Sequence, residues 1–570
     1  MTRKSLFVLI CMAGCSFNSA EAPMLIDNSC VDDVDCEQGV CSAGICIDDS
    51  AASVDVAIEV LRSSADVSGL TPASWMFGAK TATGSTDRDL DLPATRQVRG
   101  AVRWNDARVP ATLRFVRRMA QPLEPVAVEV ETLREAAGSG DSVDYDFSVV
   151  LVAGETYDVV VLPTTDMVMA TTIEEYAPAL RSLPPLYLEL AIDDGDPTEP
   201  FRFDIAFASD LAEPCVTNQD TGCTLETQVV SIDGNEPVPE PRLQVRAIDM
   251  SDGRVVSSIG ETDENGRVAI RINDSASDYW IRVTSNVGRA PFPAVSVDPD
   301  VAFADDPVEK IIYIPRLSPI QVSGRVRDVG DRPVAGATVR FLSTGIFDNT
   351  ELGLEGSFSA STTTNEDGTF GVELLAGFYS ISVTPPADTD NTWGVLHTEV
   401  VVGGELTATE DLIVPSQIGL SGWVTTFRDE AAPGLTVVAR ARSAADSITM
   451  HRTQEVVSNS VGAFSMSVDE GVYDLHVKVP SETGFPWLVE PDLSMTAVRG
   501  DLERAYRLVP PIAIRGFVRA SDGSPVADAP IRGYMLLEAE GQARRIQIGE
   551  ALSGEDGSYQ LFIAPGLGGR

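Results

Sequence analysis

The stretch from Gln321 reads QVSGRVRDVGDRPVAGATVRF, and two later stretches follow the same plan: GLSGWVTTFRDEAAPGLTVVA from Gly419 and AIRGFVRASDGSPVADAPIRG from Ala513. In each, an apolar residue stands two positions before a glycine and a valine stands two positions after it. A polar turn follows, and then a proline, small residues and a new apolar run. This order predicts a strand, a turn and a second strand.

The second half of each unit repeats as well, as NEDGTFGVELLAGFYSISVTPP from Asn365 and NSVGAFSMSVDEGVYDLHVKVP from Asn459. Apolar and polar residues alternate through the segment 379–383, which is the pattern of a half-buried antiparallel strand. Turn signals recur about every ten residues and no long helical period is present. Each unit is therefore predicted to be a small sandwich of about seven strands.

The valine that follows the glycine marks the period of the repeat. An earlier copy lies around Thr227, a more diverged one begins at Arg99, and the marker positions are Val102, Val230, Val326, Val424 and Val518. They fall 128, 96, 98 and 94 residues apart, which predicts tandem modules with an insertion in the first interval. Short proline-containing joints between the modules predict a semi-rigid rod.

These intervals divide the chain into eight segments. We expect a signal peptide at 1–14, a lipidated tether with a disulfide-rich knob at 15–50, a diverged module 1 at 51–165, an insertion at 166–222, modules 2, 3 and 4 at 223–315, 316–415 and 416–510, and an incomplete module 5 at 511–570. In module 5 the sequence stops where the tyrosine-bearing strand of modules 3 and 4 would follow. Either the sequence is part of a longer product, which we favour, or a partner covers an open sheet edge.

The V-x-G-x-V opening, the D-G-x-F/Y turn and the G-x-Y-x-L/I-x-V closing strand resemble the carboxypeptidase regulatory-like module. That module is a transthyretin-like sandwich, related in plan to Cna-B-type surface modules. The resemblance covers most of residues 98–570 and implies an all-β fold of tandem antiparallel, Ig-like β-sandwich modules. It also implies a role as a spacer, a stalk or a contact module for protein or glycan, without peptidase activity.

The first residues, MTRKSLFVLICMAGCSF, carry two basic residues, a short apolar run and small residues before a cysteine. The run is too short to span a bilayer and is typical of a secretory signal. Its end resembles a bacterial lipobox, which implies that Cys15 is lipidated, and Ser16 after it implies the outer membrane or cell surface. The alternative is an ordinary signal peptide that is cleaved near Ala20 or Ala22.

Without Cys11 in the signal and Cys15 at the anchor, six cysteines remain, and an even number in an exported chain predicts disulfides. Four of them predict two bridges in a stapled knob, with three possible connectivities, and the last two bracket a short polar loop. Their spacing lacks C-x-x-C pairs and no histidine is near, so a metal site is disfavoured. The six are Cys30, Cys36, Cys41, Cys46, Cys215 and Cys223.

The net charge of −43 excludes nucleic acid and other polyanions as partners. Clusters of aspartate, such as Asp193–Asp194, lack the spacing of a calcium loop and are expected to be solvated, so no metal or cofactor is predicted. The three histidines, His397, His451 and His476, form no recognisable catalytic motif, and no enzyme activity is expected. His476 alternates with polar residues and is expected to face solvent.

Two tryptophans, Trp280 and Trp423, are predicted to point outward from their strands, where an indole can stack on a sugar or anchor a protein contact. The pattern favours packing against a neighbouring module for both. The function predicted is a non-enzymatic surface lipoprotein, held to the membrane by its lipid, that acts as a stalk or adhesion scaffold with a surface protein or glycan as partner. The alternatives are a carbohydrate-binding array and the accessory modules of an enzyme whose catalytic domain lies beyond residue 570.

Overall fold

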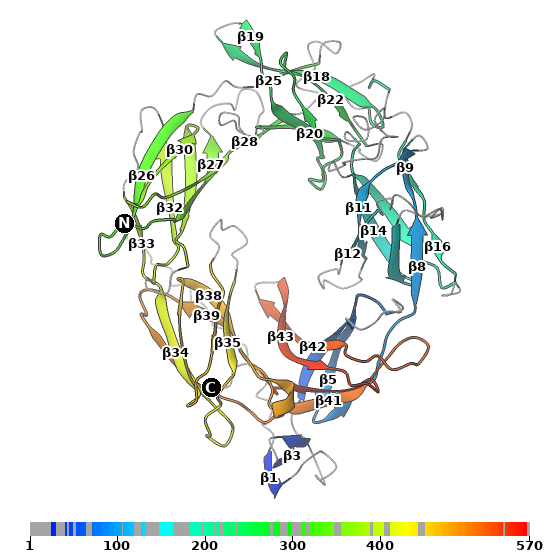
Figure 1. Ribbon diagram of the computed structural model, residues 1–570, viewed down its shortest axis with the longest axis vertical. Coiled ribbons are helices and arrows are strands. Elements are labelled where there is room, and N and C mark those ends of the chain that lie inside the picture. The colour runs from blue at the N-terminus through cyan, green and yellow to red at the C-terminus, as the bar shows by residue number, and fades with distance from the viewer. Residues whose placement is uncertain are drawn as a thin grey trace, which may run out of the picture.

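The structure, a computed structural model, is shown in Figure 1. It describes residues 24–29, 40–42, 45–48, 53–63, 71–104, 107–118, 127–132, 147–163, 183–195, 199–208, 211, 213–215, 220–233, 236–273, 278–285, 294–297, 310–314, 319–346, 355–387, 392–403, 411–442, 451–539 and 542–566. In these residues the fold is built from β-strands, as the alternating sequence predicts, with one short 3-10 turn, η4 (Ser481–Thr483).

Module 3 shows the plan of the repeat. Its first strand pairs with the fourth in the antiparallel sense and with the seventh in parallel, while the second strand lies between the third and the fifth. Alternating side chains such as Val322, Phe341 and Tyr379 fill the space between the two sheets. The seven strands are, in order, β26 (Ile320–Asp328), β27 (Thr338–Ile346), β29 (Ser359–Thr363), β30 (Thr369–Leu374), β31 (Gly377–Thr384), β32 (Leu396–Val402) and β33 (Leu412–Val414). The short β28 (Glu355–Ser357), between the second and the third, pairs with the sheet of module 2 instead.

Module 4 repeats this topology, with sheets in the order β37-β34-β40 and β36-β35-β38-β39. Its core again combines apolar residues from both sheets, including Leu420, Val437 and Tyr473. The strands are β34 (Ile418–Thr425), β35 (Thr436–Ala441), β36 (Gln454–Val457), β37 (Ala463–Val468), β38 (Gly471–Lys478), β39 (Leu488–Met495) and β40 (Leu502–Arg507).

Module 1 needs part of the segment that the long first interval assigns to an insertion. β15 extends the inner sheet beside β14, and β16 and β17 pair in parallel with β8 and β9. Residues 186–206 thus hold the sixth and seventh strands of the module, which the sequence pattern missed because its glycine and tyrosine signals mark the first, fourth and fifth strands of a unit. The strands are β8 (Thr95–Gly100), β9 (Val102–Trp104), β10 (Ala107–Arg108), β11 (Ala111–Arg117), β12 (Ala127–Glu131), β13 (Phe147–Val152), β14 (Thr156–Pro163), β15 (Leu186–Ala191), β16 (Phe201–Arg202) and β17 (Ile205–Ala206).

In module 2 the marker valine lies one position earlier than predicted. The Val229 amide donates to the Gly266 carbonyl, just as Val326 does to Gly368. Val229 is therefore the equivalent residue, and the prediction of Val230 is wrong by one position. The strands are β18 (Thr224–Asp233), β19 (Glu236–Pro239), β20 (Leu243–Asp249), β21 (Gly260–Glu261), β22 (Arg267–Arg271), β23 (Tyr279–Ser285), β24 (Ala294–Val297) and β25 (Ile311–Ile314).

The aspartate-glycine turns of the repeat have the geometry that turn chemistry predicts. The Asp367 carboxylate accepts a hydrogen bond from the Thr369 amide, and the next residue, Gly368, has φ +78°. A side chain at that position would also meet the Val326 carbonyl at 2.5 Å. The turn therefore needs glycine, both for its backbone angle and for its close approach to the opening strand.

Module 5 is built from two separate parts of the chain. Its first four strands are β41 (Ile512–Arg519), β42 (Pro530–Ala539), β43 (Gln542–Leu552) and β44 (Ser558–Ile563), and the remaining strands are β4 (Ser53–Leu61), β5 (Ser74–Thr83), β6 (Thr86–Asp87) and β7 (Leu90–Asp91). β4 pairs antiparallel with β42, while β6 and β7 run parallel to β41. We call β4–β7 the arm.

The arm occupies the positions of the fifth, sixth and seventh strands of modules 3 and 4. Val60 lies opposite Ile531 as Val383 lies opposite Val339, so β4 replaces the tyrosine-bearing strand. The strand that the sequence predicts to be absent from module 5 is thus supplied from the other end of the repeat array. The arm therefore belongs to module 5 and not to module 1.

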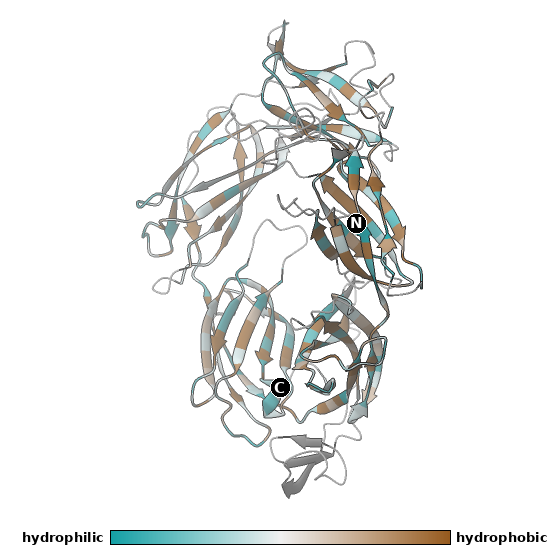
Figure 2. Ribbon diagram, turned by 45° about the vertical axis from the view of Figure 1, so that its right-hand side comes forward, coloured by the Kyte–Doolittle hydropathy of each residue, from teal (hydrophilic) through white to brown (hydrophobic). Residues whose placement is uncertain are grey.

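With the arm in place, the five modules form a closed ring (Figure 1) and not the rod that the short joints predict. In each module the sheet that contains the opening strand lies on the outer side of the ring, and the other sheet lies on the inner side (Figure 1). Hydrophobic and hydrophilic residues alternate along the strands (Figure 2), because one face of each sheet covers the core. Before the arm, β1 (Met24–Ser29), β2 (Val40–Ser42) and β3 (Ile45–Asp48) form a small separate sheet.

Candidate functional site: the joint that closes the ring

The arm enters module 5 through a row of apolar side chains. Val54, Val56, Ile58 and Val60 alternate along β4 and are 7%, 0%, 0% and 2% exposed. Burial of a valine or isoleucine side chain contributes roughly 1.5–3 kcal/mol. The arm therefore supplies a large part of the core of module 5.

A polar cluster fixes the register of β4 against its neighbours. The Glu59 carboxylate is buried and accepts hydrogen bonds from the Ser74 hydroxyl at 2.9 Å and the Tyr534 hydroxyl at 2.8 Å. Burial and the adjacent Glu59 raise the pKa of Tyr534 to about 12, so its hydroxyl keeps the proton that it donates. If the register of β4 shifted by one residue, the Glu59 side chain would point into the core, where its charge would be unpaired.

The glycine of the repeat motif explains how the seventh strand packs. A Cβ at Gly516 would lie 2.3 Å from the Arg88 carbonyl of the arm, and a Cβ at Gly422 would lie 2.0 Å from the Arg504 carbonyl in module 4. The Arg88 carbonyl also accepts a hydrogen bond from the Tyr559 hydroxyl at 2.7 Å. The glycine thus allows a neighbouring backbone to pass closely, and in module 5 that backbone belongs to the arm.

Charged residues complete the joint on its outer side. The Asp89 carboxylate accepts hydrogen bonds from the Arg519 guanidinium at 2.7 Å and from the Phe517 amide at 3.0 Å. The bond from Arg519, followed by that from the Phe517 amide, holds the pKa of Asp89 below its usual range. The Asp89 carboxylate therefore keeps its charge to a lower pH than an isolated aspartate does.

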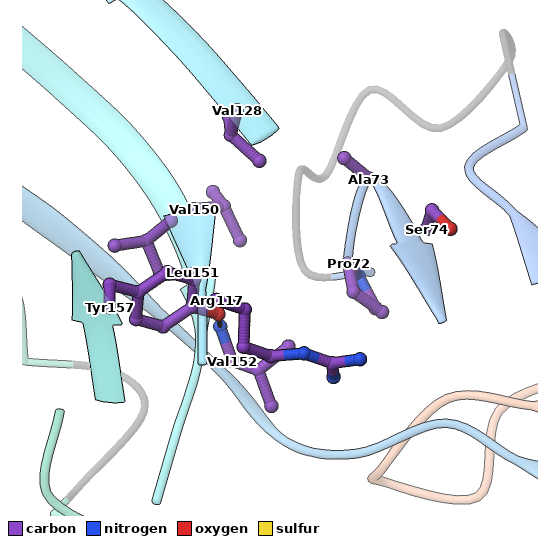
Figure 3. A pocket seen from close by; sticks show the side chains of 9 residues that line it. All are labelled: Pro72, Ala73, Ser74, Arg117, Val128, Val150, Leu151, Val152 and Tyr157. Atoms are coloured by element: carbon purple, nitrogen blue, oxygen red, sulfur yellow. Dashed lines mark hydrogen bonds between the residues drawn. The ribbon is translucent and has the colours of Figure 1, made fainter. Parts of the chain in front are cut away.

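The joint between the arm and module 1 is less tightly packed. A pocket of about 20 Å³ lies there (Figure 3), between Pro72 and Ser74 of the arm and Arg117, Val128 and Tyr157 of module 1. This is room for one or two water molecules and not for a sugar ring. The Arg117 guanidinium lies over the Trp75 ring, 4.2 Å from its centroid.

The joint between modules 3 and 4 contains a buried ion pair. The Asp469 side chain is fully buried and accepts hydrogen bonds from the Arg452 guanidinium and, across the joint, from the Val395 amide. Arg452 also donates to the carbonyls of Trp393 and Pro385 in module 3. Burial works to raise the pKa of Asp469, but the bonds from Arg452 outweigh it and hold the pKa below its usual range.

The other three joints are also held by direct contacts, and between modules 4 and 5 these are the ion pairs of Arg544 with Asp474 and Asp492. The Tyr187 hydroxyl of module 1 donates to the Val255 carbonyl of module 2 at 2.9 Å. Between modules 2 and 3, β28 extends the β24 edge as an antiparallel strand. Each joint of the ring therefore carries specific contacts, which hold the modules in fixed relative positions.

The structure places His476 differently from the sequence prediction. It is 6% exposed and not solvated, because module 5 packs over its face of the sheet and Arg544 forms ion pairs with Asp474 and Asp492. Burial lowers the pKa of His476 to about 4 despite the nearby Asp474. The sequence pattern shows the polar face but cannot show that a neighbouring module covers it.

This burial predicts a pH dependence. The folded protein keeps His476 neutral, whereas an unfolded chain takes up a proton near pH 6.5, so stability is full above that pH and falls as the pH drops toward 4. Acidification should therefore lower the free energy of unfolding less in the His476→Gln variant than in the unaltered protein, by up to about 3 kcal/mol. Urea unfolding of the variant and of the unaltered protein at pH 7 and pH 4.5 measures this difference. An equal change in unfolding free energy for the two proteins would contradict the burial of His476.

Another histidine contacts a serine. The His397 Nε2 atom lies 2.6 Å from the Ser380 hydroxyl, across β31 and β32, a pair that sequence reasoning missed because the residues are far apart in the repeat. Ser380 is 7% exposed, and in the described part of the chain no carboxylate is hydrogen-bonded to the His397 ring. An activated nucleophile needs an accessible hydroxyl and an oriented base, so the pair fits a cross-strand hydrogen bond better.

The two candidate tryptophans have different environments. Trp423 is 44% exposed on β34, and its paired neighbours on either side are Ala463 and Ala505, which leave the indole uncovered. Trp280 alternates with buried residues as predicted, but it is half-buried beside Arg282. Trp423 is thus the more accessible of the two.

Among the predicted disulfide residues, Cys215 and Cys223 form a bond, and both lie at the edge of the module 2 core. Cys41 and Cys46 lie opposite each other in the pairing of β2 with β3. Cys15, Cys30 and Cys36 lie outside the described residues. Within the described part, no helix is long and apolar enough to cross a membrane.

No protein-family model matches the sequence, and no curated protein matches it. Among solved structures, similarity is found to a streptococcal ancillary pilin (14% identity, 50% of this chain and 98% of that chain, TM-score 0.21). It is also found to GBS52, a minor pilin of Streptococcus agalactiae (12%, 33% and 95%, 0.21), and to BcpA, the major pilin subunit of Bacillus cereus (9%, 50% and 99%, 0.15). These TM-scores do not establish a shared overall fold.

Proposed function

We propose that this protein is a non-enzymatic, exported scaffold that is held to a membrane by a lipid on Cys15 and presents a ring of β-sandwich modules. The closure of the ring carries the proposal. Five modules with specific contacts at each joint hold their surfaces in fixed relative positions, as a scaffold requires. A closed ring does not project as far as a rod would, so a display or adhesion role suits it better than a stalk.

The proposed partners are a surface protein or glycan, and Trp423 is the candidate contact. Its exposed indole lies on the outer side of the ring, with only alanines beside it on the paired strands. An aromatic face of this kind stacks on sugars or anchors a protein contact. The net charge of −43 repels polyanions, so the proposed partners do not include them.

Replacement of Cys15→Ala is expected to abolish lipid attachment and release the protein from the membrane fraction. The measurement is incorporation of labelled palmitate, with fractionation of a bacterial host that expresses the full chain. Cys11→Ala is the matched control, because that cysteine precedes the proposed cleavage point. Equal labelling and membrane recovery of the Cys15 variant and the unaltered chain would contradict the lipid anchor.

A further inference from the structure

The arm is joined to the rest of the chain through a short pivot. Leu92 packs in the core of module 5 and its amide donates to the Arg519 carbonyl, whereas the Ala94 carbonyl accepts from the Ala153 amide of module 1. Only Pro93 lies between the arm, which is part of module 5, and module 1. The boundary between the arm and module 1 therefore falls at a single residue that carries no backbone donor.

The site that the arm occupies in module 5 is unstable in water when it is empty. Without the arm, β42 would present an unpaired edge, and core side chains such as Ile514, Ile531 and Leu561, now 0–1% exposed, would lose their cover. An exposed strand edge beside an apolar face pairs with any matching strand that it meets. A molecule whose arm has left is thus a receptor for an arm.

The receptor has features that select an arm of this sequence. Tyr534 requires an acceptor where Glu59 lies, Arg519 requires an acid where Asp89 lies, and Gly516 accommodates the Arg88 backbone. An arm from a second copy of this chain satisfies all three. A strand of another sequence would leave the half-buried Tyr534 hydroxyl and Arg519 guanidinium without these partners.

We propose that the arm of one copy completes module 5 of another, so that the ring opens at Pro93 and copies join head to tail. Every contact between arm and module 5 is the same in the closed and the exchanged state. The two states differ in the pivot, in the contacts beside it such as that of Arg117 with Trp75, and in whether the arm is supplied within one chain or by another, so their balance depends on protein concentration. This inference does not depend on the lipid anchor or on the proposed scaffold role.

Two variants of the chain, each with one added cysteine, test this directly. Asp87 and Arg515 lie opposite each other in the parallel pairing of β6 with β41, where the Cα separation suits a disulfide. Chains with Asp87→Cys are mixed at high concentration with chains with Arg515→Cys, warmed gently to loosen the arm, and oxidised. We expect a product that links one chain of each kind, and light scattering should show a mass that rises with concentration.

The control replaces the second partner by Val498→Cys, a fully exposed position in module 4 that reports random collision. The double variant, Asp87→Cys with Arg515→Cys, reports closure within one chain. A mixed sample that links no more than the collision control, beside efficient linking within the double variant, would show that the arm never leaves and would overturn the proposal. If neither the mixed sample nor the double variant forms the disulfide, the pairing of the arm with module 5 is itself overturned.

Discussion

Replacement of Ile58→Asp is expected to open the ring and leave module 5 unfolded or loosely packed. Ile58 is 0% exposed at the centre of β4, so the substitution places an unpaired charge in an apolar core. A cost of about 3–5 kcal/mol is typical of an uncompensated buried charge, which is enough to release the arm. Small-angle X-ray scattering should show a larger radius of gyration, while modules 1–4, which have their own cores, stay folded.

The matched control for this variant is Ser53→Asp. It adds the same charge to the same strand at an exposed position, so the scattering curve should remain that of the unaltered protein. If Ile58→Asp and Ser53→Asp give the same compact curve, then the arm does not hold the ring closed.

Replacement of Asp469→Ala is expected to weaken the joint between modules 3 and 4 by about 3–5 kcal/mol. The change leaves the Arg452 guanidinium largely buried without its counter-ion, and it removes the acceptor of the Val395 amide. The readout is the first transition in urea unfolding, which should shift to lower urea concentration.

Two further variants separate loss of the ion pair from loss of any carboxylate. Glu470→Ala removes a neighbouring exposed acid, whose side chain accepts one hydrogen bond, and it should change stability far less. Asp469→Ala combined with Arg452→Met should regain much of the lost stability, because no buried charge then remains unpaired. Equal destabilisation by the single and the double variants would contradict this account of the joint.

The sequence predicts the class of fold and the unit of repetition, because the period-2 alternation and the glycine turns depend on local chemistry. The turn at Gly368 and the outward position of Trp423 follow from the same local rules, and the structure confirms both. The opening-strand glycine, by contrast, is explained only by a contact with a distant segment, as at Gly516 beside the Arg88 carbonyl.

What the sequence does not reveal depends on contacts between distant segments. β4 alternates as a strand should, but Val56 stands where modules 3 and 4 have a tyrosine, so the motif does not identify it as their equivalent. The burial of His476 and the curvature of the array depend on how one module packs on the next. Short joints limit freedom between modules without fixing the direction in which each joint bends.

The most direct test of the closed ring is the distance between spin labels at Asp87 of the arm and Arg515 of module 5, placed in the same chain. The labelled protein is diluted with an excess of unlabelled chain, so that pairs between molecules contribute little. The paired strands β6 and β41 predict a single short distance with a narrow distribution. A broad distribution of long distances would contradict the closure of the ring by the arm.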